Sequence, residues 1–359
     1  MEMADMRGLV LAAAGRFEVR DVAEPEPGPN DALVAVTHSG ICGSELGGFR
    51  GDDGLRHPGL IFGHEFVGRV VDYGSAVASG SRLPIGTMVT ANPLRPCGRC
   101  RLCRWGHENV CTERELLGAH VHGSNAELVV VPASALLSLE AAPEPLAGVF
   151  TEPAACAWRA VRRTQVRPGG TALVIGAGPI GLLVIEVLRL HGVESVWFTE
   201  TVAGRVSAAE ASGGRLLSAE PAQLLESLLA ETSGLGVDAV FDAVGTQQTR
   251  ASATACARPG GDVMFVGLHE PDAVLPVRQL IRREINCQTS FAYSGRDFAE
   301  TLALLCSGQL RFRGEVVQAD LAEGQLWYER LLGGSAVGKV LLSPEPSLAQ
   351  SRATTELVG

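Results

Sequence analysis

The chain has 359 residues, enough to bury two hydrophobic cores, and predicts two domains of ordinary size. Its formal net charge of −10 argues against nucleic-acid binding as a main activity. No apolar stretch reaches the roughly twenty residues that span a bilayer, so no membrane partner is expected. Lys339 is the only lysine, which excludes lysine-based catalysis at every other position.

The N-terminal residues bear on the cellular compartment. Residues 1–8 carry acidic side chains and no apolar run, unlike a signal peptide. We therefore expect a cytoplasmic protein, in which clustered cysteines bind metal more often than they form disulfides.

The first 150 residues predict a mostly β domain. Short runs at 67–72, 87–91 and 128–132 are typical of strands. Residues 7–36 also predict short strands, interrupted by the proline-rich turn at 24–30.

Metal-ligand residue types occur in three motifs of this part of the chain. The motif G-I-C-G-S-E contains Cys42, G-H-E-F-V-G contains His64 and Glu65, and T-E-P-A-A-C-A contains Glu152. Zinc accepts thiolate, imidazole and carboxylate ligands, and three protein ligands leave one position open for water or substrate. Alone, Cys42 and His64 would more often be core residues. The other motifs of the chain favour a catalytic zinc site.

A second cysteine group lies between these motifs. Two C-x-x-C steps and a fourth cysteine eight residues later give Cys97, Cys100, Cys103 and Cys111. Four thiolates complete a tetrahedral shell and leave no position for substrate, so the spacing predicts a structural zinc. The alternatives are a disulfide pair, a redox C-x-x-C or an iron–sulfur cluster.

A dinucleotide-binding turn is predicted in the middle of the chain. The apolar run 171–175 reads as a buried parallel strand, and 179–191 reads as the helix that follows it. In the intervening G-x-G-x-x-G, the glycines permit a tight turn, the approach of the pyrophosphate and close helix–strand packing. The residues expected to contact the cofactor here are Gly176, Gly178, Pro179, Ile180 and Gly181.

The end of the next strand, 195–199, bears on the choice of cofactor. Glu200 follows it at the distance at which an acidic residue binds the adenosine ribose hydroxyls. Its charge would repel a 2′-phosphate, which favours NAD over NADP. Arg205 could pair with that phosphate instead, although its place in the next helix favours a solvated surface charge.

The sequence pattern changes at residue 153. From there on, expected helices and apolar strands alternate as in a doubly wound parallel sheet. Further strands are expected at 239–242 and 262–266, with helical segments at 224–229 and 249–256 between the strands. A helix at 298–306 then precedes short strands that end at 339–342.

These motifs, in this order and ending in G-K-V at 338–340, resemble the zinc-dependent medium-chain alcohol and polyol dehydrogenases over nearly the whole chain. The resemblance implies an α/β fold with a discontinuous, mostly β, GroES-like catalytic domain at 1–152 and 298–359. It implies a Rossmann NAD-binding domain at 153–297. It also implies a homodimer or homotetramer, and adds Val244, Gly267 and Lys339 to the cofactor contacts.

The resemblance also assigns roles around the catalytic zinc. Ser44 would hydrogen-bond the substrate alkoxide, and Glu45 would support His64. Either Glu65 or Glu152 can complete the ligand set, and a glutamate at 152 points to the polyol branch. The sequence departs from many relatives at Gly47, where they carry a histidine that ends a proton relay.

We therefore expect an oxidoreductase that transfers hydride between NAD and a secondary alcohol such as a polyol, cyclitol, vicinal diol or amino-cyclitol. A threonine-dehydrogenase-like or simple secondary-alcohol activity is the alternative, as is a catalytically silent NAD-binding zinc protein. His269 is a further candidate for substrate contact, and His120 and His122 could approach the cleft or lie in an exposed loop.

Overall fold

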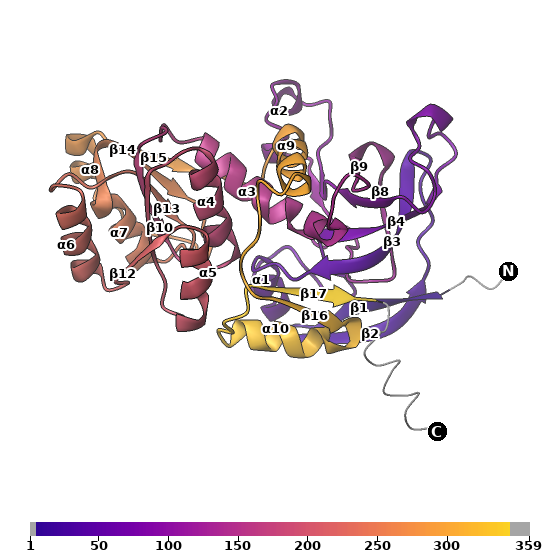
Figure 1. Ribbon diagram of the computed structural model, residues 1–359. Coiled ribbons are helices and arrows are strands. Elements are labelled where there is room, and N and C mark those ends of the chain that lie inside the picture. Colours follow the sequence, from indigo (N-terminus) through magenta and orange to yellow (C-terminus); the bar gives the residue numbers. More distant parts are fainter. Residues whose placement is uncertain (1–4, 345–359) are drawn as a thin grey trace.

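Two β-sheets lie side by side in the computed structural model, which describes residues 5–344 (Figure 1). One sheet is built mostly from the first third of the chain, and the other is entirely parallel. The tail 345–359 of the expected catalytic domain lies outside the described residues. Among those residues, no helix has the length and apolar character that crossing a bilayer requires.

The first sheet has seven strands in the order β16-β17-β3-β4-β5-β9, with β8 paired to β3. Its strands are β3 (Asp31–Gly40), β4 (Glu65–Tyr73), β5 (Met88–Ala91), β8 (Leu128–Pro132), β9 (Leu136–Ser138), β16 (Val316–Asp320) and β17 (Lys339–Ser343). Because β16 and β17 come from the end of the chain, the C-terminal segment returns to this sheet. Two smaller pairs are β1 (Asp5–Ala13) with β2 (Arg16–Ala23) and β6 (Leu94–Arg95) with β7 (Glu115–Leu116).

The second sheet has six parallel strands in the order β12-β11-β10-β13-β14-β15. They are β10 (Thr171–Ile175), β11 (Ser195–Thr199), β12 (Arg215–Leu217), β13 (Val237–Asp242), β14 (Ala257–Phe265) and β15 (Asn286–Thr289). The chain runs outward from β10 on one side and then returns to β13 on the other. The neighbouring ends of β10 and β13 therefore form a topological switch point, where ligands bind in open α/β sheets.

Helices cover the parallel sheet and connect it to the first one (Figure 1). Those that follow the strands of the parallel sheet are α4 (Pro179–Leu190), α5 (Val206–Ala211), α6 (Pro221–Glu231), α7 (Gln247–Cys256) and α8 (Val277–Arg283). The others are α1 (Glu45–Arg50), α2 (Arg101–Arg104), α3 (Thr151–Arg162), α9 (Gly295–Cys306) and α10 (Gly324–Leu332), with a 3₁₀ turn at Glu108–Val110.

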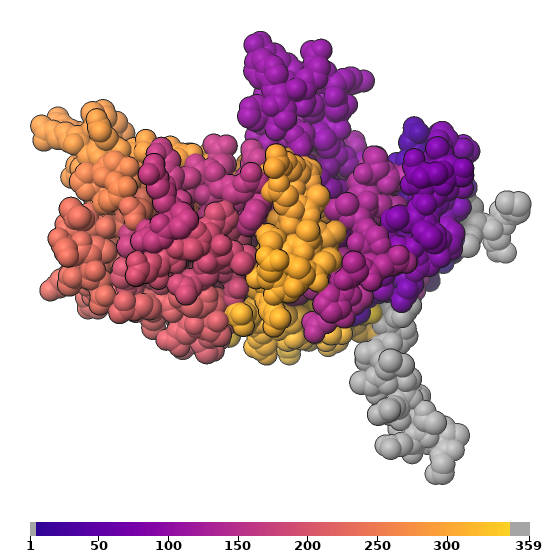
Figure 2. Space-filling model, turned by 45° about the horizontal axis from the view of Figure 1, so that its top comes forward, coloured from indigo at the N-terminus to yellow at the C-terminus, as the bar shows by residue number. Residues whose placement is uncertain are grey.

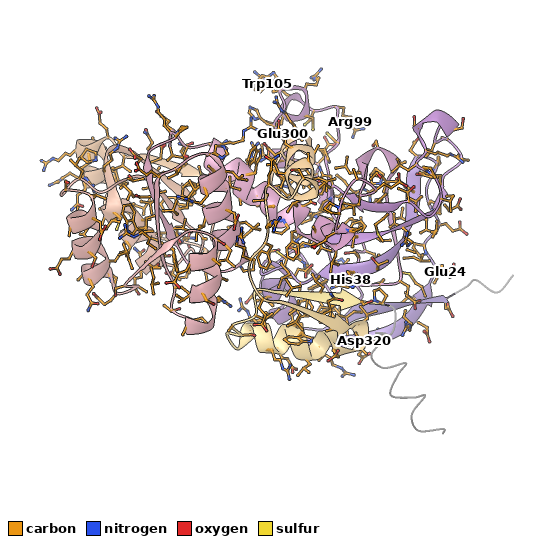
Figure 3. The ribbon with its side chains drawn as sticks, in the orientation of Figure 1. Glu24, His38, Arg99, Trp105, Glu300 and Asp320 are labelled. Carbon is orange, nitrogen blue, oxygen red and sulfur yellow. The ribbon has the colours of Figure 1, made fainter. Side chains whose placement is uncertain are left out.

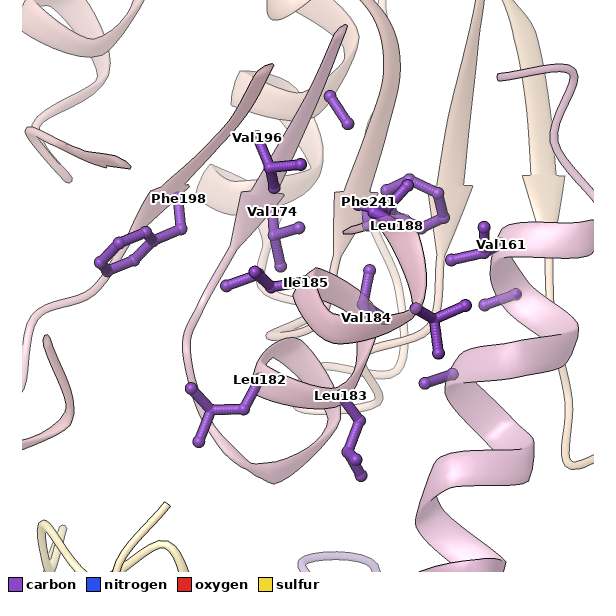
Figure 4. Close-up of a cluster of buried hydrophobic side chains, with 14 of the residues drawn as sticks. Val161, Val174, Leu182, Leu183, Val184, Ile185, Leu188, Val196, Phe198 and Phe241 are labelled. Atoms are coloured by element: carbon purple, nitrogen blue, oxygen red, sulfur yellow. The ribbon is translucent and has the colours of Figure 1, made fainter. Parts of the chain in front are cut away.

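The core of the second part lies between α4 and the sheet (Figure 4). Val174 on β10, Phe198 on β11 and Phe241 on β13 are fully buried there. Leu183 and Ile185 on α4 are buried in the same cluster. The strands are apolar on both faces, which is the pattern of a parallel sheet covered by helices.

Helices α3 and α9 pack against each other between the two sheets (Figure 3, where Glu300 on α9 is labelled). Arg159 lies 3.0 Å from Asp297, and the Trp158 indole donates to Glu300 at 3.1 Å. The domain boundaries expected at 152/153 and 297/298 both fall inside these helices. The two helices themselves therefore make the connection between the two parts.

The predicted α/β fold is confirmed, and the strands expected at 128–132, 171–175 and 195–199 have the predicted bounds. Strand β15 was not anticipated, because its sequence N-C-Q-T carries no apolar alternation. It is an edge strand whose side chains are largely exposed, so packing does not require an apolar alternation in this sequence. Helix α10 was also missed.

Candidate catalytic centre and dinucleotide site

Cys42, His64 and Glu65 are brought together by the pairing of β3 with β4. Gly40, at the end of β3, pairs with Glu65, at the start of β4. Cys42 follows β3 and His64 precedes β4, so both lie at the same end of the strand pair. One ligand atom from each residue lies within 4.8 Å of the others. Gly40 is needed here, because a Cβ at this position would overlap the Glu65 carboxylate.

The orientation of His64 is set by Glu45, at the start of α1. The His64 Nδ1 lies 3.0 Å from Glu45 Oε1, which leaves Nε2 as the ligand atom. Glu45 is fully buried and also accepts from the Gly63 amide at 2.9 Å and the Tyr328 hydroxyl at 2.6 Å. Burial would raise the pKa of Glu45, but the hydrogen bond and charge of His64, with Arg56 and Tyr328, lower it to about 2. Glu45 is therefore an ionised partner for the imidazole.

The Glu65 carboxylate is held by the only lysine of the chain. Lys339 Nζ, on β17, donates to both Glu65 oxygens at 2.7 and 2.9 Å and to the Ile41 carbonyl at 3.2 Å. Both side chains are buried. The structure thus places Lys339, expected among the cofactor contacts, against a candidate metal ligand.

Glu152 lies in the first turn of α3 beside this group. Burial is the main reason that the pKa of Glu152 is raised, and the charge of Glu65 adds to the rise against the opposing charge of His64. One Glu152 oxygen lies 3.9 Å from the Cys156 thiol, one turn along the helix. Glu152 is outside the 4.8 Å group, so three ligand types converge and a fourth carboxylate stands nearby.

This donor set fits zinc. A thiolate, an imidazole and a carboxylate that converge from one side are the ligands of an open catalytic site. The Ser44 hydroxyl donates to Cys42 Sγ at 3.3 Å, and Ser44 is exposed to solvent. Ser44 therefore stands beside the ligands on the accessible side.

The four cysteines of the second group also converge. Their sulfurs are separated by 3.5 Å between Cys100 and Cys103, 3.8 Å between Cys100 and Cys111, and 3.9 Å between Cys97 and Cys103. Tetrahedral zinc with bonds near 2.3 Å requires about 3.8 Å between sulfurs, whereas a disulfide requires about 2.05 Å. All nine cysteines are free, and all lie in the described residues. Hydrogen bonds from the Arg99 and Cys100 amides lower the pKa of Cys97 to about 7, which favours its thiolate form.

The dinucleotide turn joins β10 to α4 as the motif predicts. Gly176 has φ +90°, and Gly181 lies so close to the Gly176 carbonyl that a Cβ would overlap it. Gly178 caps α4, and only the far end of Arg205 approaches the position of its missing Cβ. Glu200, after β11, accepts from the Ala177 amide at 2.9 Å. The turn is therefore shaped for close approach of a phosphate group to the backbone.

Arg205 is not the solvated surface charge that the sequence favours. Its Nη2 donates to the Ser335 carbonyl at 2.6 Å, and its Nη1 is the heavy atom nearest a Cβ built on Gly178, at 4.0 Å. The Nε is buried. The local helix pattern placed Arg205 at the surface, but the C-terminal loop covers it in the folded chain.

The other predicted cofactor contacts follow neighbouring strands of the parallel sheet. Val244 follows β13, and Gly267 follows β14. The two lie so close together that a Cβ on Gly267 would overlap the Val244 backbone. His269 is exposed just beyond. His120 and His122 each accept a backbone amide through Nδ1, from Leu116 and Ile61 respectively.

Two residues of the catalytic centre were not anticipated from the sequence. Tyr328, on α10, bonds Glu45, and Tyr293, after β15, is fully buried in one cluster with Ala155 and Phe298. Neither belongs to a recognisable motif. That only three tyrosines occur in the chain, two of them here, is a weak compositional signal.

A candidate three-ligand metal site and a Rossmann turn in one chain define a class of zinc- and nicotinamide-dependent oxidoreductases. Residues 28–141 match the model of the alcohol dehydrogenase GroES-like domain, and residues 179–307 match that of the zinc-binding dehydrogenases. The chain belongs to the zinc-dependent medium-chain alcohol and polyol dehydrogenases.

Individual relatives agree with this family. A probable zinc-binding alcohol dehydrogenase of Mycobacterium tuberculosis is 33% identical over 86% of this chain and 80% of its own length. A sorbitol dehydrogenase of Halalkalibacterium halodurans is 29% identical over 94% of this chain and 99% of its own. A proposed zinc-binding dehydrogenase of Sinorhizobium meliloti, solved bound to NADP, has a TM-score of 0.87 at 29% identity, covering 95% of this chain and 100% of its own.

Proposed function

We propose that this enzyme oxidises a secondary alcohol that carries a neighbouring hydroxyl, such as a polyol, cyclitol or vicinal diol, with NAD as the hydride acceptor. The observation that carries the proposal is Glu152, a buried carboxyl with a raised pKa beside Cys42, His64 and Glu65. A polar group at this depth suits a hydroxyl-rich substrate, because a purely apolar alcohol would leave it without a partner.

Two bound groups supply the chemistry that the side chains lack. Cys42, His64 and Glu65, with Glu152 available for exchange, would hold a zinc ion, which would supply a Lewis acid for the substrate hydroxyl. The turn at 176–181 would hold the dinucleotide, whose nicotinamide would supply the hydride acceptor.

The side chains hold the substrate and release its proton. Ser44 is exposed beside Cys42 and is placed to accept the hydroxyl proton and pass it to water. Gly47 offers no imidazole for a relay, so the exposure of Ser44 provides a direct route to solvent. Glu45 keeps the His64 ring in one orientation throughout.

A substrate panel tests this function. Purified enzyme with NAD should oxidise sorbitol, xylitol, inositol or butane-2,3-diol faster than propan-2-ol, and threonine should be a poor substrate. Preferred turnover of threonine or propan-2-ol would replace the polyol assignment by the corresponding alternative. No turnover of any alcohol, with both zinc sites occupied, would support a silent NAD-binding protein.

We also propose that NAD is preferred over NADP. Glu200 lies against the dinucleotide turn through Ala177, so a 2′-phosphate there would meet a like charge. The Arg205 guanidinium lies near Gly178, a place suited to the pyrophosphate. A cost of about 2–4 kcal/mol corresponds to kcat/KM for NAD exceeding that for NADP by roughly two orders of magnitude. Glu200→Ala should narrow this gap by admitting NADP, and a wild-type preference for NADP would overturn the role of Glu200.

We also propose that the protein acts in the cytoplasm as a homo-oligomer. The outer edge of β15 has backbone groups available for pairing, and Leu268, Val274 and Ile281, in the connection from β14 to β15, are 77%, 80% and 71% exposed. An open edge strand and exposed apolar side chains suit pairing with a second copy about a two-fold axis. Light scattering should show at least a dimer, which Ile281→Glu should weaken. A monomer at all concentrations would refute this assembly.

A further inference from the structure

The segment that carries Tyr293 is clamped by the four-cysteine lobe, residues 97–111. The Asn109 amide, 3% exposed, donates to the Phe291 carbonyl at 2.7 Å. Glu108 accepts from the Gly295 amide at 2.9 Å, and Arg114, three residues after the lobe, has its guanidinium 4.8 Å from the centre of the Phe291 ring. The lobe therefore holds the chain two residues before and two residues after Tyr293.

The two residues that hydrogen-bond this segment, Glu108 and Asn109, lie inside the loop that carries the four cysteines. Glu108 and Asn109 form the 3₁₀ turn between Cys103 and Cys111. In Figure 2 the lobe stands out from the body of the molecule beside the orange segment that contains α9. A metal held by the four sulfurs would fix this turn, and the turn contacts the segment before α9.

The clamped segment has a backbone that needs such support. Ala292 has φ +47°, a conformation that costs a non-glycine residue energy unless its surroundings impose it. Tyr293 is 0% exposed and packs against Phe298 with ring centres 5.4 Å apart.

The Tyr293 hydroxyl is buried without a hydrogen bond of standard geometry. Cys156 of α3 packs against the cluster that contains Tyr293, and its thiol lies 3.9 Å from a Glu152 oxygen. A buried hydroxyl without a partner is costly, and the Glu152 carboxylate is an acceptor one turn along α3 from Ala155 and Cys156 of this cluster. The Tyr293 hydroxyl therefore has the Glu152 carboxylate as its candidate partner. Under the proposed function, this carboxylate binds the second hydroxyl of the substrate.

We propose that the cysteine lobe positions Tyr293 against Glu152, so that Tyr293 orients this carboxylate in the substrate site and Asn109 keeps Tyr293 in place. This inference rests on the proposed role of Glu152. It gives the structural metal a role in turnover that is separate from its contribution to folding.

Kinetics of five variants test the coupling. Tyr293→Phe and Asn109→Ala should each lower kcat by about five- to tenfold, because Glu152 then loses the group that orients it, with smaller changes in KM for NAD. The double variant should lose no more than the single ones, because both act through one contact. Glu108→Gln keeps an acceptor for Gly295 and should retain activity. Arg99→Ala, on the exposed face of the lobe, is the matched control.

Fluorine NMR provides a readout that does not depend on activity. The sequence has three tyrosines, so the full-length, zinc-loaded protein labelled with 3-fluorotyrosine should give three resonances, assigned by Tyr→Phe replacement. The Tyr293 resonance should shift in Asn109→Ala and in Glu152→Gln, while that of Tyr73 should not. Zinc content, measured in parallel, should stay at the wild-type value.

The outcomes separate the two proposals. A Tyr293 resonance that ignores both substitutions, or kinetic losses that add in the double variant, would overturn the positioning role whatever the substrate. A resonance that responds as expected in a protein that oxidises no alcohol would support the positioning and refute the proposed function.

Discussion

Lys339 and Glu65 form a buried ion pair between β17 and β4, with Lys339 Nζ 2.7 Å from one carboxylate oxygen and 2.9 Å from the other. Their side chains are 2% and 0% exposed. Strand β3 lies between the two strands, so the pair joins the C-terminal segment to the catalytic centre. It holds a candidate metal ligand in place through a residue 274 positions away.

Removal of the lysine should leave a buried carboxylate without its partner. Lys339→Met is expected to lower the free energy of unfolding by about 3 kcal/mol in urea titrations. Lys339→Met combined with Glu65→Gln should recover most of that loss, because no unpaired charge remains. If the single variant were as stable as the wild-type protein, the ion pair would not support the fold.

The Tyr328 hydroxyl should influence metal binding through Glu45. Tyr328→Phe removes the 2.6 Å hydrogen bond and leaves Glu45 freer to move with His64. The affinity of the catalytic site for zinc is expected to fall roughly tenfold in competition with a chelator. Tyr73→Phe, which loses only a contact with Leu83, is the matched control. Equal zinc affinities in the two variants would contradict this role.

The two cysteine sites should respond differently to substitution. Elemental analysis is expected to find two zinc ions per chain. Cys97→Ser should lower the stability of the fold, because a structural metal contributes its binding energy to folding. Cys42→Ser should abolish turnover and leave the fold near intact. Cys287→Ser, at an exposed position outside both sites, is the control. Wild-type turnover by Cys42→Ser would refute the catalytic assignment.

Asp297, at the start of α9, should make the stability of the fold depend on pH in the acid range. Burial would raise the pKa of Asp297, but hydrogen bonds from Ser294 and the pairing with Arg159 lower it below its usual value of 3.8. A carboxyl with a lowered pKa in the folded state stabilises the fold above its unfolded pKa, and this contribution is lost as pH falls through the folded value.

Asp297→Asn should therefore be less stable than the wild-type protein near neutral pH, and the difference should shrink as pH falls below about 4. Urea unfolding from about pH 7 to about pH 3 would measure it. Asp272→Asn, at an exposed position, should show no such trend. A difference that did not change with pH would mean that the Asp297 charge makes no contribution.

The sequence by itself determined the motifs that act over short distances. The glycine turn at 176–181 and the cysteine spacing at 97–111 encode local geometry, because each needs only neighbouring residues to shape a binding surface. The apolar runs of β10 and β11 likewise mark buried parallel strands. These features were enough to predict a parallel nucleotide-type sheet and a four-cysteine cluster, whereas the GroES-like catalytic domain was expected from the family resemblance.

Only the tertiary structure decided how distant groups meet. The contacts of Lys339 with Glu65, Tyr328 with Glu45, and Asn109 with the segment before Tyr293 join residues 274, 283 and 182 positions apart. No spacing rule relates such residues, because their approach depends on the return of the C-terminal segment to the first sheet and on the docking of the lobe. Arg205 shows the same limit: its helix suggests a surface charge, but a loop from the other end of the chain covers it.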